Sequence, residues 1–186
     1  MTRFAALLIF LIPFTVPAMV WHQGSVVLAS GEVLTGEISR QSDDLILLRS
    51  AGEMKVLPAH KVRSFRYHDA AQNINRRFLA LAAGTTAYYH FFETVTSGNL
   101  TVLRKQRMFR ESIEEEDSGS FEFYIMSDGA VTLMKNFRTR YYNSIRHRLE
   151  GNGVDISSFD PNSPADALRL ILLFNQLPAT RPIAAI

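Results

Sequence analysis

The chain has 186 residues, of which 47% are hydrophobic and 20% are charged. This length can bury one sizeable core, and the composition excludes a disordered chain. The 20 basic and 18 acidic residues give a formal net charge of +2. Because the basic excess is so small and shows no clustered face, we expect no nucleic acid among the partners.

The first 18 residues have the features of a secretory signal peptide. A short positive start is followed by an apolar run over residues 4–12, and prolines then interrupt the helical pattern. Val16 and Ala18 meet the requirement for small residues before a cleavage site. The sequence therefore predicts a signal peptide over 1–18, cleaved after Ala18, and a protein that is periplasmic or secreted.

An uncleaved membrane anchor is the alternative for this segment. Pro13 and Pro17 disfavour a continuous spanning helix, so cleavage is favoured over retention. The chain also lacks cysteine. The exported fold therefore has no disulfides, and no lipid can be attached to an N-terminal cysteine.

Short apolar runs separated by turns fill residues 19–69 and predict a β-meander. Ser30-Gly31 is the turn of a first hairpin, and further turns at 43–44 and 51–53 separate the next strands. The stretch 27–38 is similar to the opening of SH3-like and Sm-like small barrels, and this resemblance implies a barrel-like N-terminal region. Gly36 would permit the strand bend that such a barrel requires.

Residues 70–85 are interpreted as a connection, with helix and strand both left open. Residues 86–135 are predicted to form antiparallel hairpins with turns at 97–99 and at Asp128-Gly129. The aromatic run 88–92 has two apolar faces, which favours a central strand covered on both sides over an exposed platform for sugars or peptides.

Two helices are predicted over residues 136–178. The first is capped by Asn136, ends at Gly151 and carries an apolar stripe at four-residue spacing. That stripe consists of Phe137, Tyr141, Ile145 and Leu149. The second begins at Ser163-Pro164, ends near Gln176 and is expected to bury Leu168, Ile171 and Leu172. The predicted fold class is thus α+β, mostly β, with a small barrel-like antiparallel meander, a second hairpin region and two C-terminal helices.

The combination of these elements resembles a group of small exported proteins, common in Bacteroidota, that are functionally uncharacterised. The resemblance lies in the signal peptide, the hairpin around Gly31 and Gly36, the later hairpins and a final helix that ends at Phe174-Asn175. It implies export and a β-rich fold. It implies no activity and no catalytic residue.

Histidines and a neighbouring carboxylate are the only candidates for catalytic chemistry that the sequence offers. They are His60, His68, His90 and His147, with Asp69 beside His68. No nucleophile-elbow pattern, metal-ligand spacing or glycine-rich phosphate loop accompanies them. We therefore assign no catalytic, cofactor-binding or metal-binding residues, and we expect no cofactor.

Charged runs have two interpretations. The acidic run Glu114 to Asp117 could bind calcium weakly, but it lacks the alternating ligands of a calcium loop, so a solvated loop is favoured. Arginines and lysines recur over 104–110 and 138–148. A solvent-facing surface is favoured there, and contact with an anionic membrane surface is the alternative.

The sequence favours an exported, non-enzymatic binding or assembly module of the cell envelope, whose partner is an unknown protein or envelope component. This interpretation predicts an exposed apolar patch or an unpaired sheet edge. The alternative is a secreted hydrolase, which predicts that some of His60, His68, His90 and Asp69 share a concave pocket.

Overall fold

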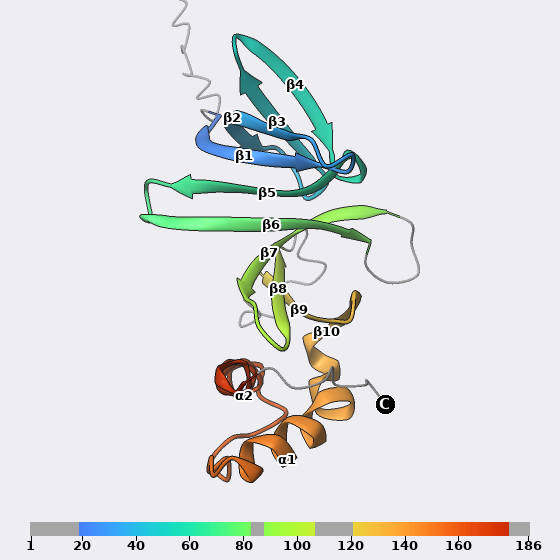
Figure 1. Ribbon diagram of the computed structural model, residues 1–186, viewed down its shortest axis with the longest axis vertical. Helices are drawn as coiled ribbons and strands as arrows, with labels where there is room; N and C mark the ends of the chain where they lie inside the picture. Colours follow the sequence, from blue (N-terminus) through green and yellow to red (C-terminus); the bar gives the residue numbers. More distant parts are fainter. Residues whose placement is uncertain (1–18, 83–87, 107–120, 179–186) are drawn as a thin grey trace, which may run out of the picture.

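The computed structural model describes residues 19–82, 88–106 and 121–178. The predicted signal peptide, the acidic run Glu114 to Asp117, and Arg107 and Arg110 lie outside these residues. The described part is elongated, with the first strands at one end and the helices at the other (Figure 1). No helix within it is both long enough and apolar enough to cross a membrane.

Within the described residues, ten antiparallel strands form one sheet. The strands are β1 (His22–Leu28), β2 (Val33–Arg40), β3 (Leu45–Ser50), β4 (Glu53–Pro58), β5 (Val62–Asp69), β6 (Ile74–Ala82), β7 (Tyr89–Thr96), β8 (Thr101–Gln106), β9 (Phe121–Ser127) and β10 (Ala130–Leu133). Their order is β10-β9-β8-β7-β6-β5-β1-β2-β3-β4. The sheet is open, so the barrel-like region is curled but not closed, and its edge strands are β4 and β10.

The N-terminal half of the sheet curls tightly around an apolar core. Gly24 of β1 and Gly36 of β2 are paired, and a Cβ on Gly24 would lie 2.2 Å from the carbonyl oxygen of Arg66. Only glycine therefore permits this close approach of neighbouring strands. The enclosed core consists of Val26, Ile38, Ile46, Leu48, Leu57, Ala59, Val62, Phe65, Phe78, Ala80 and Phe91.

The stretch 70–85, for which the sequence left helix and strand open, contains the central strand β6. This strand pairs with β5 on one side and with β7 on the other. Phe91 and Phe92 of β7 are 1% and 0% exposed and belong to different apolar clusters. The prediction of a central strand covered on both faces is therefore confirmed for Phe91 and Phe92, but not for Tyr88 and Tyr89, which are 74% and 44% exposed.

The helices pack at the far end of the sheet, beyond β8 to β10 (Figure 1). They are the short helices η2 (Met134–Asn136) and η3 (Arg138–Tyr142), followed by α1 (Asn143–Gly151) and α2 (Pro164–Gln176). All four residues of the predicted first stripe are buried, from Phe137 at 1% to Leu149 at 0% exposure. The predicted side-chain cap by Asn136 is not present, because the chain passes from η2 through the π-helical turn η3 into α1.

α2 begins as expected, with the Ser163 hydroxyl accepting a hydrogen bond from the Asp166 amide. The predicted burial of Leu172 is wrong, since this side chain is 41% exposed. The buried face instead contains Ala167, Leu170, Ile171 and Phe174. α2 is therefore rotated relative to the stripe that the sequence suggested, and Leu168 is only partly buried.

The end of α2 is fixed to the turn between β7 and β8. The side-chain amide of Asn175 accepts a hydrogen bond from the Leu100 N–H (2.9 Å) and donates one to the Leu100 carbonyl (2.8 Å). Asn99 Nδ2 in turn donates to the carbonyls of Phe174 and Leu177. Gly98 leaves room for this contact, because a Cβ there would lie 2.6 Å from Asn175 Cγ. We call this arrangement the Asn175 clamp.

Candidate functional site

The histidines proposed from the sequence lie on separate elements. His60 is exposed in η1 (Ala59–Lys61), and His147 is exposed on α1. His68 is exposed on β5, and its Nδ1 lies 3.1 Å from Asn75 Oδ1. Asp69 is buried, and as the next residue of the same strand it faces the opposite side of the sheet. The structure therefore does not bring His68 and Asp69 together.

His90 lies on β7, on the same side as the buried Phe92. Its Nδ1 and the Thr94 hydroxyl are buried, and in the described part of the chain neither has a hydrogen-bond partner. No described cluster of histidines and carboxylates could hold a metal ion. The arrangement that the hydrolase alternative requires is thus not found around His90.

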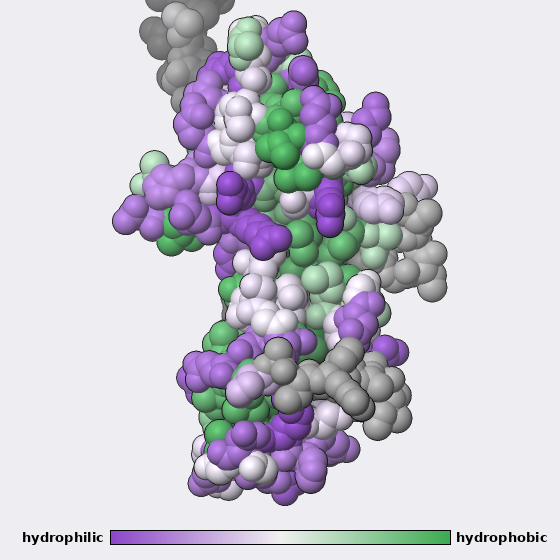
Figure 2. All heavy atoms as spheres, viewed as in Figure 1, coloured by the Kyte–Doolittle hydropathy of each residue, from purple (hydrophilic) through white to green (hydrophobic). Residues whose placement is uncertain are grey.

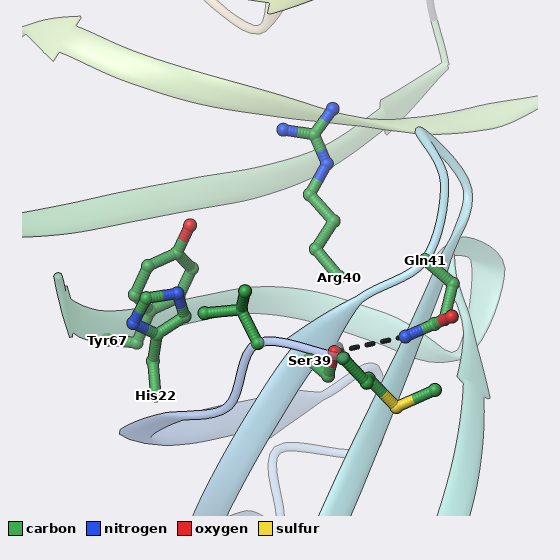
Figure 3. A pocket seen from close by; sticks show the side chains of 7 residues that line it. His22, Ser39, Arg40, Gln41 and Tyr67 are labelled. Atoms are coloured by element: carbon green, nitrogen blue, oxygen red, sulfur yellow. Dashed lines mark hydrogen bonds between the residues drawn. The ribbon is translucent and has the colours of Figure 1, made fainter. Parts of the chain in front are cut away.

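A cleft of about 520 Å³ opens beside the start of β1 and the end of β2. It is lined by Met19, Val20, His22, Ser39, Arg40, Gln41 and Tyr67. The His22 and Tyr67 rings are stacked with their centroids 4.4 Å apart, and Gln41 donates to the Ser39 hydroxyl (Figure 3). Neither His60, His68, His90 nor Asp69 lines this cleft.

A chain of ion pairs lies across the sheet beside Tyr67. Arg76 of β6 bridges Asp69 of β5 (2.9 Å) and Glu93 of β7 (2.7 Å). Arg104 of β8 donates both Nε and Nη2 to Glu93, at 2.8 and 3.0 Å. We call these four residues the ion ladder. Glu93 and Arg104 are direct cross-strand partners, whereas Arg76, which is opposite Tyr67, reaches Asp69 and Glu93 as diagonal neighbours on the adjacent strands.

The ladder and the cleft influence each other electrostatically. Burial raises the pKa of the Tyr67 hydroxyl, although the charges of Arg76 and Arg40 oppose this change. The hydrogen bond from Arg76 lowers the pKa of Asp69. Burial by itself would lower the pKa of Arg76, but its hydrogen bond with Asp69 and the charge of Glu93 outweigh that effect and raise it. These three shifts keep Tyr67 neutral and keep Asp69 and Arg76 ionised at neutral pH.

The lowered pKa of Asp69 predicts a pH dependence of stability. A carboxyl group whose pKa is lower in the folded state stabilises the fold above its unfolded value of 3.8. That stabilisation is lost as the pH falls below this value toward the folded pKa. In the wild-type protein the free energy of unfolding should decrease as the pH drops below about 4, and this decrease should be smaller in Asp69→Asn. Urea denaturation at each pH measures the free energy. Asp44→Asn, at an exposed position, should leave the profile unchanged, and an unchanged profile in Asp69→Asn would contradict the prediction.

The charges around the cleft are balanced. Arg40 pairs with Asp43 at 2.5 Å, and its guanidinium lies 5.6 Å from the centroid of the Phe78 ring. Arg76 and Arg104 are paired within the ladder. Since each of these three cations already has a carboxylate partner, the cleft offers no strong attraction for an anionic ligand.

The predicted basic surface on the first helix is also partly neutralised. Arg146 pairs with Glu150, and Arg138 donates to Asn162. Arg148 donates to the Pro178 carbonyl, and its guanidinium lies 4.9 Å from the centroid of the Phe174 ring. Of these arginines only Arg146 pairs with a carboxylate in the described part of the chain, so contact with an anionic membrane surface stays a prediction.

The strand β4 forms one edge of the sheet and exposes apolar side chains. Met54 is 63% exposed and Val56 is 58% exposed. Both residues lie on the same side of the strand, two positions apart. At the upper end of Figure 2, where Figure 1 draws the first strands, hydrophobic side chains are visible between hydrophilic ones. An exposed, partly apolar edge of this kind can pair with another extended chain.

The backbone of β4 presents hydrogen-bonding groups at alternate residues. Ser50 and Glu53 flank the two-residue turn Ala51-Gly52, in which both residues have positive φ, and therefore bond to each other. The same alternation turns the backbone of Lys55 toward β3. It leaves the N–H and C=O groups of Met54 and Val56 directed away from the sheet. Pro58, which has no N–H, falls in this outward set, as edge prolines do.

Sequence reasoning missed the residues that the structure brings together beside the cleft. They are His22, Arg40, Tyr67, Arg76, Glu93 and Arg104. Of these, only Arg104 lies in a stretch that the sequence singled out, the basic run over 104–110. Their positions in separate strands give no local pattern, and only the strand register reveals the contact. The signal in the sequence was a single acidic residue, Glu93, within the aromatic and β-branched strand β7. Comparison with protein-family models, with curated proteins and with solved structures finds no match for this chain.

Proposed function

We propose that the protein is an exported, non-enzymatic binding or assembly module of the cell envelope, which holds an extended segment of a partner protein against strand β4. The observation that carries the proposal is the open edge of β4, with Met54 and Val56 exposed and their backbone groups directed outward. Binding of this kind uses main-chain hydrogen bonds for affinity and side-chain contacts for specificity.

The other edge of the sheet is less suited to this role. β10 has four residues, against six in β4, and η2 follows it directly. Val131 and Leu133 of β10 are partly buried against the cluster around Phe92. β4 therefore offers both the longer edge and the more exposed apolar side chains.

Export is the second part of the proposal and is supported by the sequence of residues 1–18. Its charged start, apolar run and small residues before Met19 are those of a cleaved leader. Mass spectrometry of the protein purified from expressing cells should give a chain that begins at Met19. A chain that retains Met1 would contradict cleavage.

Binding is tested with the neutral peptide acetyl-Thr-Thr-Val-Thr-Val-Thr-Thr-amide. We expect this peptide to shift the amide NMR signals of Met54 and Val56 in the ¹⁵N-labelled protein, expressed as the full chain and purified after export. Methylation of the two valine nitrogens, which face β4 in the bound strand, should abolish the shifts. Methylation of the threonine between them, whose nitrogen faces away, should preserve binding.

A pair of matched variants tests whether the peptide binds at β4. Val56→Asp adds a charge at the edge and should raise the dissociation constant of the neutral peptide at least tenfold. The bound strand would bury a carboxylate that has no partner, which is unfavourable. Val33→Asp is the control, since Val33 is equally exposed at 61% but lies on the interior strand β2. No shift at β4 with the unmethylated peptide would refute the proposed function.

A further inference from the structure

Lys55 lies between the two outward-directed residues of β4 and is exposed. We infer that the partner segment has an acidic residue opposite Lys55, flanked by apolar residues opposite Met54 and Val56. This inference rests on the proposed function, because it specifies the partner of the same edge. It assigns the pattern apolar-acidic-apolar to the segment that β4 binds.

The backbone determines where the partner's residues lie. Met54 and Val56 can each exchange a pair of hydrogen bonds with a residue of the incoming strand. Pro58 cannot donate, so the hydrogen-bonded segment ends there. The partner residues opposite Met54 and Val56 lie on the exposed apolar side of β4, and the residue between them lies opposite Lys55.

Lys55 projects on the other side of the strand, with the buried Leu48 as its cross-strand neighbour. Lys55 itself is exposed, and no ion pair or hydrogen bond to its side chain is present in the described part of the chain. Residues directly opposite in a non-hydrogen-bonded pair have their side chains closest together. A carboxylate opposite Lys55 therefore gains an ion pair, and a lysine there is repelled.

The same geometry disfavours a second copy of this chain as the occupant. In the register that pairs Met54 with Val56 of the other copy, Lys55 faces Lys55 across the two-fold axis. A register centred on Met54 pairs Glu53 with Lys55 but sets Val56 opposite the turn residue Gly52. Only Met54 could then exchange strand hydrogen bonds, so a foreign acidic strand fits better than a second copy in either of these two registers.

The inference is tested with two variants of the neutral peptide in which the threonine between the valines is replaced. They are acetyl-Thr-Thr-Val-Glu-Val-Thr-Thr-amide and acetyl-Thr-Thr-Val-Lys-Val-Thr-Thr-amide. Their dissociation constants are measured by NMR titration of the exported full-length protein at low salt. We expect the glutamate peptide to bind roughly tenfold more tightly than the lysine peptide. In Lys55→Glu the preference should reverse, whereas Lys135→Glu, an exposed charge reversal on η2, should leave it unchanged.

The outcomes separate this inference from the proposed function. Equal binding of the acidic, neutral and basic peptides at β4 would overturn the acidic pattern and leave strand addition intact. Binding of none of them would overturn both. A dimer detected by analytical ultracentrifugation of the wild-type protein and abolished by Lys55→Glu or Val56→Asp would show that β4 pairs with a second copy, and would also overturn the inference.

Discussion

Glu93→Ala should lower the free energy of unfolding by about 3 kcal/mol, because it removes the carboxylate that holds Arg76 and Arg104 in the ion ladder. Glu93 is 8% exposed, so the two guanidinium groups would be left partly buried without their shared partner. Urea denaturation monitored by tryptophan fluorescence and circular dichroism measures the change, which corresponds to a decrease in Tm of roughly 10 °C.

A matched control for this prediction is Glu150→Ala. Glu150 also pairs with an arginine, but Arg146 and Glu150 are 53% and 45% exposed. Ion pairs this exposed contribute little, so the control should be indistinguishable from wild type. If Glu93→Ala were as stable as that control, the ladder would have no structural role.

Asn175→Ala should lower the free energy of unfolding by about 3 kcal/mol, because it deprives both backbone groups of Leu100 of their partner in the Asn175 clamp. Leu100 is 1% exposed, so water has little access to the groups left unpaired. Asn175→Asp retains an acceptor for the Leu100 N–H but sets a carboxylate oxygen against the Leu100 carbonyl, so it should not restore wild-type stability. Denaturant unfolding measures all three proteins.

Gln176→Ala is the control for the clamp, since Gln176 is the neighbouring residue on α2 and its side chain is exposed. It should unfold with wild-type stability. A second readout is hydrogen exchange at Leu100, which should accelerate strongly in Asn175→Ala and remain slow in Gln176→Ala. Slow exchange in both variants would show that the clamp does not hold the turn to α2.

The mostly β fold with two C-terminal helices could be predicted because its signals are local. Asp128-Gly129, with φ values of 50° and 81°, forms the hairpin turn that the dipeptide indicates. Ser163-Pro164 begins α2 for an equally local reason. Leu172 was placed on the wrong face because α2 is hydrophobic on more than one side, and only contact with the sheet decides which side is buried.

The candidate sites could not be predicted in the same way. Arg76, Glu93 and Arg104 come together through strand register, which depends on how three hairpins align. The edge position of β4 depends on the pairing of β1 with β5 rather than of β4 with β5. Both are long-range properties that no dipeptide or periodicity contains.

The pairing of β1 with β5 also has a consequence for the order in which the chain can fold. Ser25 pairs with Arg66, 41 residues later, so one edge of β1 has no partner until β5 is available. Pairings so distant in sequence form slowly, because a long loop must close first. The sheet around β1 therefore cannot be completed until the chain has been synthesised past β5 (Val62–Asp69).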